Sequence, residues 1–382
     1  MVSNALLISP YHAESHKIWA EAVIAMCPEF NWRLTSLPPR FFDWRIRGNA
    51  LALLFEPRFS DAFKNLDLIV ATSMTDLSSL KGLCPDIQQV PCVIYFHENQ
   101  FAYPPNQAGP LKRSLEAKMV TLYGALAADL VLFNSEFNFS TFIGGAKEML
   151  KNFPDHAPLN CIKEIEDKSR VLAVPIAGID GIAQANSGHE ANIGASEPLK
   201  IAWNHRWEYD KGPDRLVAVI EQVAARNLNC EFSIFGQRFR QVPKCFEGLP
   251  SRYPKLINHF GYVDDKQEYY LMLQEHHVVL STSLHDFQGL SVLEATHLGC
   301  VPLVPDRLAY REYLPAWCRY PSNLADIRTE TMVIVSRLEN LASELRRGAL
   351  PQPPSLDALA MSVLAPKYRT TLHALLANRK GG

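Results

Sequence analysis

The strongest constraint on the fold is a repeated alternation of short, continuous apolar runs with longer helical patterns. Continuous β-branched runs predict strands that are buried on both sides, and strands that alternate with helices predict parallel sheets covered on both faces. In the first half of the chain the runs are Ala5–Ser9, Trp32–Leu37, Leu66–Ala71, Cys92–Phe96, Leu130–Asn134 and Val171–Val174. In the second half they are Lys200–Trp203, Glu231–Phe235, Ile257–Phe260, Val278–Ser281 and Val301–Val304. The sequence therefore predicts an α/β protein.

A change in composition divides the chain near its middle. Residues 178–198, GIDGIAQANSGHEANIGASEP, are small, polar and aperiodic, which is typical of an interdomain linker. A chain of 382 residues is long enough for two or three domains, each with a core of its own. We therefore expect two Rossmann-like domains, residues 1–177 and 199–350. Residues 351–382 begin with the helix breaker PQPP and continue as a helical tail.

Several classes of protein are disfavoured by what the sequence lacks. No apolar run approaches the ~20 residues that span a bilayer, and MVSNALLISPYH at the N-terminus lacks the features of a signal peptide. Eight scattered cysteines without C-x-x-C indicate reduced thiols, a cytoplasmic location and no zinc site. The absence of G-x-G-x-x-G and G-x-x-x-x-G-K-[ST] argues against a dinucleotide dehydrogenase and a P-loop NTPase. With no D-x-D triplet either, we expect no cofactor and no metal.

Residues 281–305 have the pattern of an anion-binding site. A strand, a loop that ends in Gly289 and a helix that Gly299 ends are expected in that order. The unpaired N–H groups at the start of such a helix bind phosphate. Asp286 and Glu294 lie eight positions apart, and carboxylates accept hydrogen bonds from sugar hydroxyls. The pattern indicates a sugar-nucleotide site; the alternative is an ordinary βαβ turn with a solvated Asp and a surface Glu. Besides Glu294, the donor contacts predicted in this stretch are Gln288, Gly289 and Leu290.

The stretch WNHRWEYDKGPD (203–214) follows the first strand of the second half. Arg206 and Lys211 combine a planar guanidinium with a point-charged ammonium, which together offset the charge of a departing nucleoside diphosphate. The alternative is a surface salt-bridge pair with the neighbouring acids at positions 208 and 210. Further donor contacts are predicted at Asn204 in this stretch and at Gly236 and Gln237 after the next strand.

Polar clusters end the strands of the first half, where open α/β sheets place their ligands. They are YFHENQFAYP (95–104), FNSEFN (133–138) and SPYHAESHK (9–17). His97 and Glu98 in the first cluster are the catalytic candidates, although a lone histidine is more often structural. The predicted acceptor contacts in these clusters are Ser15, His16, Asn99, Gln100, Asn134 and Ser135.

The stretch PPRFFDWRIRGN (38–49) interleaves arginines with aromatic residues. Such a pattern suits phosphate contacts and base stacking on a single-stranded nucleic acid. Because the formal net charge is −2, contact with a nucleic acid requires a local basic patch of this kind. Equally, W-R-I-R is compatible with a strand edge whose Arg stems cover apolar surface. The nucleic-acid interpretation adds Arg40, Trp44, Arg45 and Arg47 to the acceptor contacts.

D-F-Q-G-L-S-V-L-E (286–294) resembles the acidic-x7-Glu signature of family 4 retaining glycosyltransferases. That resemblance implies the GT-B fold, two Rossmann-like domains whose parallel sheets face a central cleft, often with a last helix that returns to the N-terminal domain. It implies a catalytic contact of Asp286 with the donor sugar, ribose binding by Glu294, and diphosphate binding by Arg206 and Lys211. The chain departs from the family in having Asp286 in place of Glu, and Ala13-Glu14 in place of a Gly-Gly pair.

The strings YFHENQ, FNSEFN, SHK, HRWEYDK and HxFxG together resemble the tRNA-queuosine alpha-mannosyltransferase family. The resemblance implies GDP-mannose as donor and queuosine in a tRNA anticodon as acceptor. It also implies a same-face substitution in which the departing phosphate takes the acceptor's proton, and in which His97 stabilises the sugar or the acceptor. Glu98 as a nucleophile is an alternative.

Two other functions stay open on the sequence. One is a hexosyltransferase that acts on a lipid, a glycan or a small molecule. The other is a non-catalytic sugar-nucleotide-binding protein, against which the complete set of Arg206, Lys211 and Glu294 argues. No membrane insertion is expected, and no oligomeric state is predicted.

Overall fold

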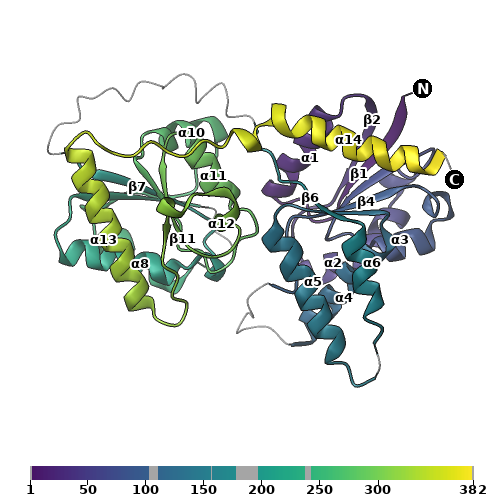
Figure 1. The fold of residues 1–382 in the computed structure, drawn as a ribbon, viewed down its shortest axis with the longest axis horizontal. Helices are drawn as coiled ribbons and strands as arrows, with labels where there is room; N and C mark the ends of the chain where they lie inside the picture. The colour runs from purple at the N-terminus through teal and green to yellow at the C-terminus, as the bar shows by residue number, and fades with distance from the viewer. Residues whose placement is uncertain (1, 103–110, 156, 178–196, 237–241, 381–382) are drawn as a thin grey trace. The chain divides into compact units, whose positions relative to one another are not determined.

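The computed structural model describes residues 2–102, 111–155, 157–177, 197–236 and 242–380. The chain forms two compact units: residues 1–177 together with 358–382, and residues 178–357 (Figure 1). Each unit contains one six-stranded sheet in which all strand pairs are parallel. The α/β prediction with two Rossmann-like domains is confirmed. Of the predicted linker, residues 178–196 lie outside the described residues.

The sheet of the first unit has the strand order β2-β1-β3-β4-β5-β6. Its strands are β1 (Ser3–Ser9), β2 (Phe30–Ser36), β3 (Leu68–Thr72), β4 (Cys92–Phe96), β5 (Leu130–Phe133) and β6 (Ser169–Val171). The helices of this unit are α1 (Glu14–Met26), α2 (Phe42–Phe55), α3 (Leu77–Leu83), α4 (Leu111–Ala127), α5 (Glu136–Lys151), α6 (Asn160–Asp167) and α14 (Met361–Lys380). Residues 44–47 lie within α2, so the interpretation of W-R-I-R as a strand edge is wrong.

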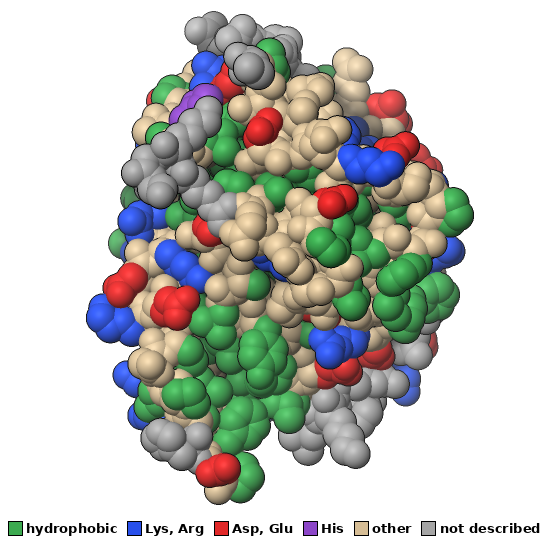
Figure 2. Space-filling view, turned by 90° about the vertical axis from the view of Figure 1, so that its right-hand side faces the viewer, with side chains coloured by type: hydrophobic (Ala, Val, Ile, Leu, Met, Phe, Trp, Pro, Cys, Tyr) green, Lys and Arg blue, Asp and Glu red, His purple; other side chains and the backbone are tan. Residues whose placement is uncertain are grey.

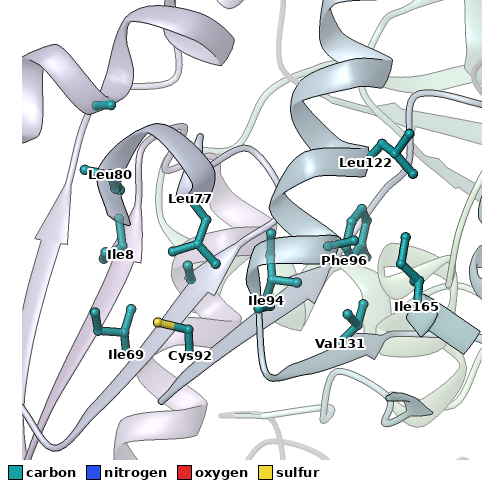
Figure 3. Close-up of a cluster of buried hydrophobic side chains, with 14 of the residues drawn as sticks. Ile8, Ile69, Leu77, Leu80, Cys92, Ile94, Phe96, Leu122, Val131 and Ile165 are labelled. Carbon is teal, nitrogen blue, oxygen red and sulfur yellow. The ribbon is translucent and has the colours of Figure 1, made fainter. Parts of the chain in front are cut away.

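The core of the first unit is built from the apolar runs that the sequence marks as strands. Every residue of β3 and β4 is buried, as expected for central strands of a covered parallel sheet. Figure 3 shows strand side chains such as Ile69, Ile94 and Phe96 in one cluster with Leu77 of α3 and Leu122 of α4. The carboxyl ends of the strands are thereby held at one edge of a rigid sheet.

Helix α14 is part of the first unit, although the second unit precedes it in sequence. In Figure 1 it is the yellow helix beside α1. The hydroxyl of its buried Tyr368 accepts a hydrogen bond from Trp19 Nε1 (3.1 Å) and donates one to the carbonyl of Ala173 (3.0 Å). Just before the helix, the Ile176 N–H donates to the Leu359 carbonyl at 2.9 Å. These contacts attach the tail to α1 and to the segment that follows β6.

The sheet of the second unit has the order β12-β11-β10-β7-β8-β9. Its strands are β7 (Leu199–Asn204), β8 (Cys230–Phe235), β9 (Ile257–Gly261), β10 (Val278–Leu280), β11 (Val301–Pro305) and β12 (Arg319–Tyr320). Its α-helices are α8 (Pro213–Ala225), α9 (Leu249–Arg252), α10 (Lys266–Gln274), α11 (Leu290–His297), α12 (Tyr310–Tyr313) and α13 (Ile327–Arg346). Strand β12 is too short to be predicted from periodicity. Because β7 pairs with β10 and β10 with β11, the loops that leave these strands come together.

Candidate functional site

The loop between β10 and α11 contacts the loop that follows β7. The ammonium nitrogen of Lys211 donates to the His285 carbonyl at 2.8 Å and lies 3.3 Å from Asp286 Oδ2. The other carboxylate oxygen, Asp286 Oδ1, accepts the N–H of Gly289 at 3.0 Å. The two motifs that the sequence places far apart therefore meet, and Asp286 connects Lys211 to the start of α11.

Lys211 lies between two acidic side chains in a buried setting. Its side chain is 10% exposed, and its ammonium is 3.3 Å from both Asp210 Oδ2 and Asp286 Oδ2. Burial alone lowers the pKa of Lys211, but the carboxylates of Asp286 and Asp210 outweigh it and raise the pKa. Burial by itself raises the pKa of Asp286. The charge of nearby Lys211, with smaller contributions from His205 and His285, outweighs burial, so the pKa of Asp286 is lowered overall. Both groups are therefore charged at neutral pH.

Glycine is required at two of the predicted donor positions. Gly289, the N-cap of α11, has φ +78°, and a Cβ there would lie 2.5 Å from the Tyr310 ring. Gly236 after β8 has φ +147°, and its Cβ would collide with the His205 carbonyl oxygen. At both positions the backbone approaches a neighbouring element too closely for a side chain.

A hydrogen-bonded group of side chains that the sequence analysis missed lies behind the Asp286 loop. Ser281 Oγ contacts His205 Nε2 at 3.0 Å and the Tyr310 hydroxyl at 2.8 Å. Tyr310 in turn donates to Asp286 Oδ2 at 3.4 Å. Burial lowers the pKa of His205 to about 3, so its imidazole is neutral at pH 7. The HRWE string was the available signal, but the 76-residue separation of His205 and Ser281 hides their contact.

A buried ion network supports the same loop from the side of α13. Arg307 donates from Nε to the Ser283 carbonyl at 2.9 Å and pairs with Glu330 at 2.7 Å. Glu330 also pairs with Arg215 of α8 at 3.0 Å. Two guanidinium groups thus share one fully buried carboxylate, and the network joins the loop to two helices.

The remaining predicted donor residues differ in their surroundings. Arg206 is 46% exposed and pairs with Glu208 at 3.1 Å. This pair is one of those expected if Arg206 and Lys211 only form surface salt bridges with residues 208 and 210. Glu294 is half-buried and accepts from the Tyr270 hydroxyl at 3.3 Å. Asn204 donates to the Ser291 carbonyl at 2.7 Å, in the first turn of α11. Gln288 is buried, Leu290 is the first residue of α11, and Gln237 lies outside the described residues.

In the first unit His97 directly follows β4 and lies in a group of stacked rings. Its imidazole stacks on that of His16 with centroids 4.3 Å apart, and the rings of Tyr95 and Trp19 lie at 4.7 and 4.9 Å. His16 Nδ1 is 2.7 Å from the Tyr11 carbonyl, so this nitrogen carries a proton and donates it. Burial, with a smaller contribution from His16, holds the pKa of His97 well below its usual value. His97 is therefore a neutral imidazole at pH 7.

Three of the predicted acceptor contacts are engaged in the protein's own structure. The side-chain amide of Asn99 donates to Asn138 and Thr141 of α5 and accepts from two N–H groups of its own loop. Asn134 donates to the His97 carbonyl at 2.9 Å. Ser135 caps α5 by accepting the Asn138 N–H at 3.0 Å. These side chains hold the loop that carries His97. Glu98 and Gln100 in that loop are partly exposed, and Ser15 is exposed.

The arginines of residues 38–49 do not form one basic patch. Arg47 pairs with Asp76 at 2.8 Å and lies 3.7 Å from Glu116. Arg45 is half-buried, whereas Arg40 is exposed and lies over the Phe41 ring at 5.5 Å. On the face in Figure 2, basic side chains are scattered and several lie beside acidic ones. A phosphate contact of Arg47 stays a prediction, but its guanidinium already pairs with two carboxylates.

The described residues hold no group of three or more His, Cys, Asp or Glu side chains placed to bind a metal ion. Among the same residues, no helix is both long and apolar enough to cross a membrane.

The fold resembles that of solved proteins at low sequence identity. Sucrose-phosphate synthase from Thermosynechococcus elongatus superposes with a TM-score of 0.65 at 15% identity, over 98% of this chain and 100% of that one. The trehalose-6-phosphate protein from E. coli, bound with UDP-2-fluoro glucose, gives 0.64 at 13% identity, over 98% and 99%. These similarities concern the fold alone. The chain has the GT-B fold, as the signature in residues 286–294 predicted.

Sequence comparison finds two similarities to tRNA-queuosine alpha-mannosyltransferases. Residues 4–176 match the family model described as tRNA-queuosine alpha-mannosyltransferase N-terminal. A Drosophila melanogaster protein named tRNA-queuosine alpha-mannosyltransferase is 29% identical over 379 residues, which are 99% of this chain and 98% of that protein. The chain is therefore similar to tRNA-queuosine alpha-mannosyltransferases over its N-terminal half and, at lower stringency, along almost its whole length.

Proposed function

We propose that the protein transfers mannose from GDP-mannose to queuosine in the anticodon of a tRNA, with retention of configuration and without a metal or cofactor. The observation that supports this proposal is the match, along almost the whole chain, to a protein named tRNA-queuosine alpha-mannosyltransferase. A tRNA acceptor also fits a cytoplasmic location.

The second unit supplies the proposed donor site. The first-turn N–H groups of α11, next to Gly289, are oriented for the diphosphate, as at other helix starts. Arg206, which is half-exposed, supplies the mobile positive charge. Lys211 is buried against Asp286, so we assign it two effects: it keeps Asp286 ionised and adds a fixed positive charge. Glu294 would accept hydrogen bonds from the ribose hydroxyls.

Asp286 is a catalytic contact in this proposal because of how it is held. Its carboxylate is fixed by Lys211, the Gly289 N–H and Tyr310, and it is 17% exposed. A carboxylate positioned in this way accepts hydrogen bonds from hydroxyls of the donor sugar without reorganising. The shorter Asp in place of Glu is compensated if the loop itself approaches the sugar.

The first unit supplies the proposed catalytic imidazole and acceptor contacts. Neutral His97 has one donor and one acceptor nitrogen, which suits hydroxyl groups of the sugar or acceptor better than a cation would. We keep Glu98, Gln100, Ser15 and His16 as substrate contacts in this proposal. Asn99, Asn134 and Ser135 become positioning residues, because their side chains hold the loop after β4 and the start of α5.

The proposed transfer is a same-face substitution. The bond between the anomeric carbon and the diphosphate oxygen breaks as the acceptor oxygen bonds to that carbon from the same side. The acceptor's hydroxyl proton passes to the departing phosphate oxygen, so no protein base is required. Arg206 and the α11 N-terminus would stabilise the negative charge that develops on the leaving group. Glu98 as a nucleophile would instead require a covalent intermediate.

The test is transfer of radiolabelled sugar from GDP-mannose, UDP-glucose and UDP-galactose to tRNA that contains or lacks queuosine, each with excess EDTA. We expect label only from GDP-mannose and only on queuosine-containing tRNA. Label on a lipid or glycan fraction instead would favour the other hexosyltransferase function. Donor binding without transfer to any acceptor would favour a non-catalytic sugar-nucleotide-binding protein.

A further inference from the structure

Trp44 lies flat against its own helix in the first unit. A Cβ added at Gly48, one turn further along α2, would lie only 2.5 Å from Trp44 Cε2. One face of the indole therefore covers the backbone of Gly48, where no side chain larger than hydrogen fits without displacing the ring. The indole is nevertheless 54% exposed. Glycine in the middle of α2 costs about 1 kcal/mol of helix stability relative to alanine. Here its missing side chain leaves room for the Trp44 ring against the helix.

The start of α2, the helix that carries this ring, is linked to the candidate catalytic imidazole of the same unit. Helix α2 begins after β2, at the carboxyl edge of the sheet, and His97 directly follows β4 at the same edge. Phe42 at the start of α2 contacts the Tyr11 ring, with centroids 6.0 Å apart. The Tyr11 carbonyl accepts from His16, whose ring stacks on His97. A continuous chain of contacts thus joins the start of α2 to His97.

The charges around Trp44 are balanced. The Arg47 guanidinium is bound by Asp76 and lies near Glu116. Beside the indole is a hollow of about 250 Å³ lined by apolar atoms of Gly48, Leu51 and Leu83 and by the Arg47–Asp76 pair. A neutral, flat group is better suited to this setting than a phosphate, because Arg47 is already neutralised. Arg40, two residues before α2, is exposed and has a guanidinium that suits a phosphate.

We propose that Trp44 is a stacking platform for one unpaired nucleobase of the RNA acceptor. In this arrangement Arg40 contacts the phosphate next to that base, and Arg47 contacts no phosphate. This inference rests on the proposed function, since it takes an RNA as acceptor. Aromatic side chains bind unpaired bases in this way irrespective of base identity. Gly48 is the residue that positions the platform.

A second copy of the chain is the competing occupant of this face. Phe41, Leu51 and Phe55 are also exposed on α2, at helical spacings that suit packing against another helix. RNA is favoured because the start of α2 is linked through Tyr11 and His16 to His97, and because the indole is held flat with one face outward. The test therefore measures the oligomeric state as well as RNA binding.

The experiment compares full-length wild type with Trp44→Ala, Trp44→Phe and Gly48→Ala. Gly144→Ala in α5 is the matched control, because a Cβ at Gly144 meets nothing within 4 Å. Affinity for queuosine-containing tRNA and for a synthetic RNA stem-loop with an unpaired loop is measured by filter binding at several salt concentrations. GDP-mannose binding is measured by calorimetry, and sedimentation velocity gives the oligomeric state.

We expect Trp44→Ala to weaken RNA binding by about 5- to 150-fold with an unchanged salt slope, and Trp44→Phe to retain most of the affinity. Gly48→Ala should lose affinity without losing thermal stability, and Gly144→Ala should bind like wild type. Arg40→Ala should reduce the slope of log affinity against log salt by about 0.7, whereas Arg47→Ala should leave the slope unchanged.

Wild-type RNA affinity in Trp44→Ala, while wild type itself binds RNA, would overturn the platform and leave the proposed function intact. Failure of wild type to bind any RNA would overturn both. A dimer that Trp44→Ala converts to a monomer without a change in RNA affinity would assign this face to a second copy.

Discussion

Replacing Lys211 by Met tests the buried pair that holds the loop after β10. The substitution keeps the length of the side chain and removes the charge between Asp210 and Asp286. Removing one partner of a buried ion pair costs about 3–5 kcal/mol, because the remaining charge is left unpaired in a desolvated setting. For a domain of this size, each kcal/mol lowers Tm by about 2–4 °C. We therefore expect the melting transition of the second unit to fall by about 6–20 °C at pH 7.

The pH dependence of this loss has a defined sign. In wild type the pKa of Asp286 is below the ordinary value of 3.8 for an aspartate, so its charge stabilises the fold above that pH and the contribution is lost on acidification. Without Lys211, the burial that favours the neutral acid loses its main opponent, and the folded-state pKa rises. The variant then loses stability as pH rises through that value. The difference from wild type should be largest at pH 7 and smaller near pH 5.

Differential scanning calorimetry at the two pH values measures both effects. Arg206→Met is the control, because its half-exposed pair with Glu208 is worth at most about 1 kcal/mol. Adding Asp286→Asn to Lys211→Met should recover part of the lost stability, because it removes one of the two carboxylate charges that the loss of Lys211 leaves unpaired. A Lys211→Met protein that melts within about 2 °C of wild type at pH 7 would refute the reasoning. The Lys211–Asp286 pair would then contribute no more to stability than an ordinary surface salt bridge.

Three further predictions concern the leaving group, the metal and the tail. Arg206→Ala should cost about 2–4 kcal/mol in transition-state stabilisation with an unchanged Tm, measured as kcat/KM; wild-type turnover would remove Arg206 from the diphosphate site. Transfer should persist in excess EDTA, and an absolute requirement for added Mn²⁺ would contradict the metal-free mechanism. Tyr368→Ala should destabilise the first unit by about 3–5 kcal/mol because its buried ring joins α14 to α1, whereas unchanged thermal unfolding would mean that α14 adds nothing to that unit.

Local chemistry explains why the geometry of the loop before α11 was predictable. Asp286, Gly289 and the start of α11 lie within one strand-loop-helix segment, whose geometry depends on neighbours in sequence. The Gly289 φ of +78° and the Asp286 hydrogen bond to its N–H are properties of that segment. His205, Ser281 and Tyr310 were missed because their contacts depend on strand order, which no local pattern encodes.

The arginine–aromatic stretch shows the opposite case. Sequence spacing placed Arg40, Trp44 and Arg47 together, yet it left a nucleic-acid contact and a strand edge open. It could not show that the stretch is helical or that Asp76 and Glu116 pair with Arg47. Likewise, the amides of Asn99 and Asn134 were expected to contact substrate, whereas in the structure they hold a loop. A polar residue at a strand end has the same sequence signature in both roles.

The sequence by itself determined the βα alternation, the two Rossmann-like domains and the positions of the motifs at strand ends. It could do so because hydrophobic periodicity and turn residues act over a few neighbours. Only the tertiary structure decided the partners of charged and aromatic side chains: Lys211 with Asp286, His16 with His97, Arg47 with Asp76, and α14 with α1. The hydrogen-bonded pairs among these partners are 29 to 349 positions apart in the sequence. They meet only because parallel strands bring their carboxyl ends to one edge of a sheet, and because the last helix packs on the first unit.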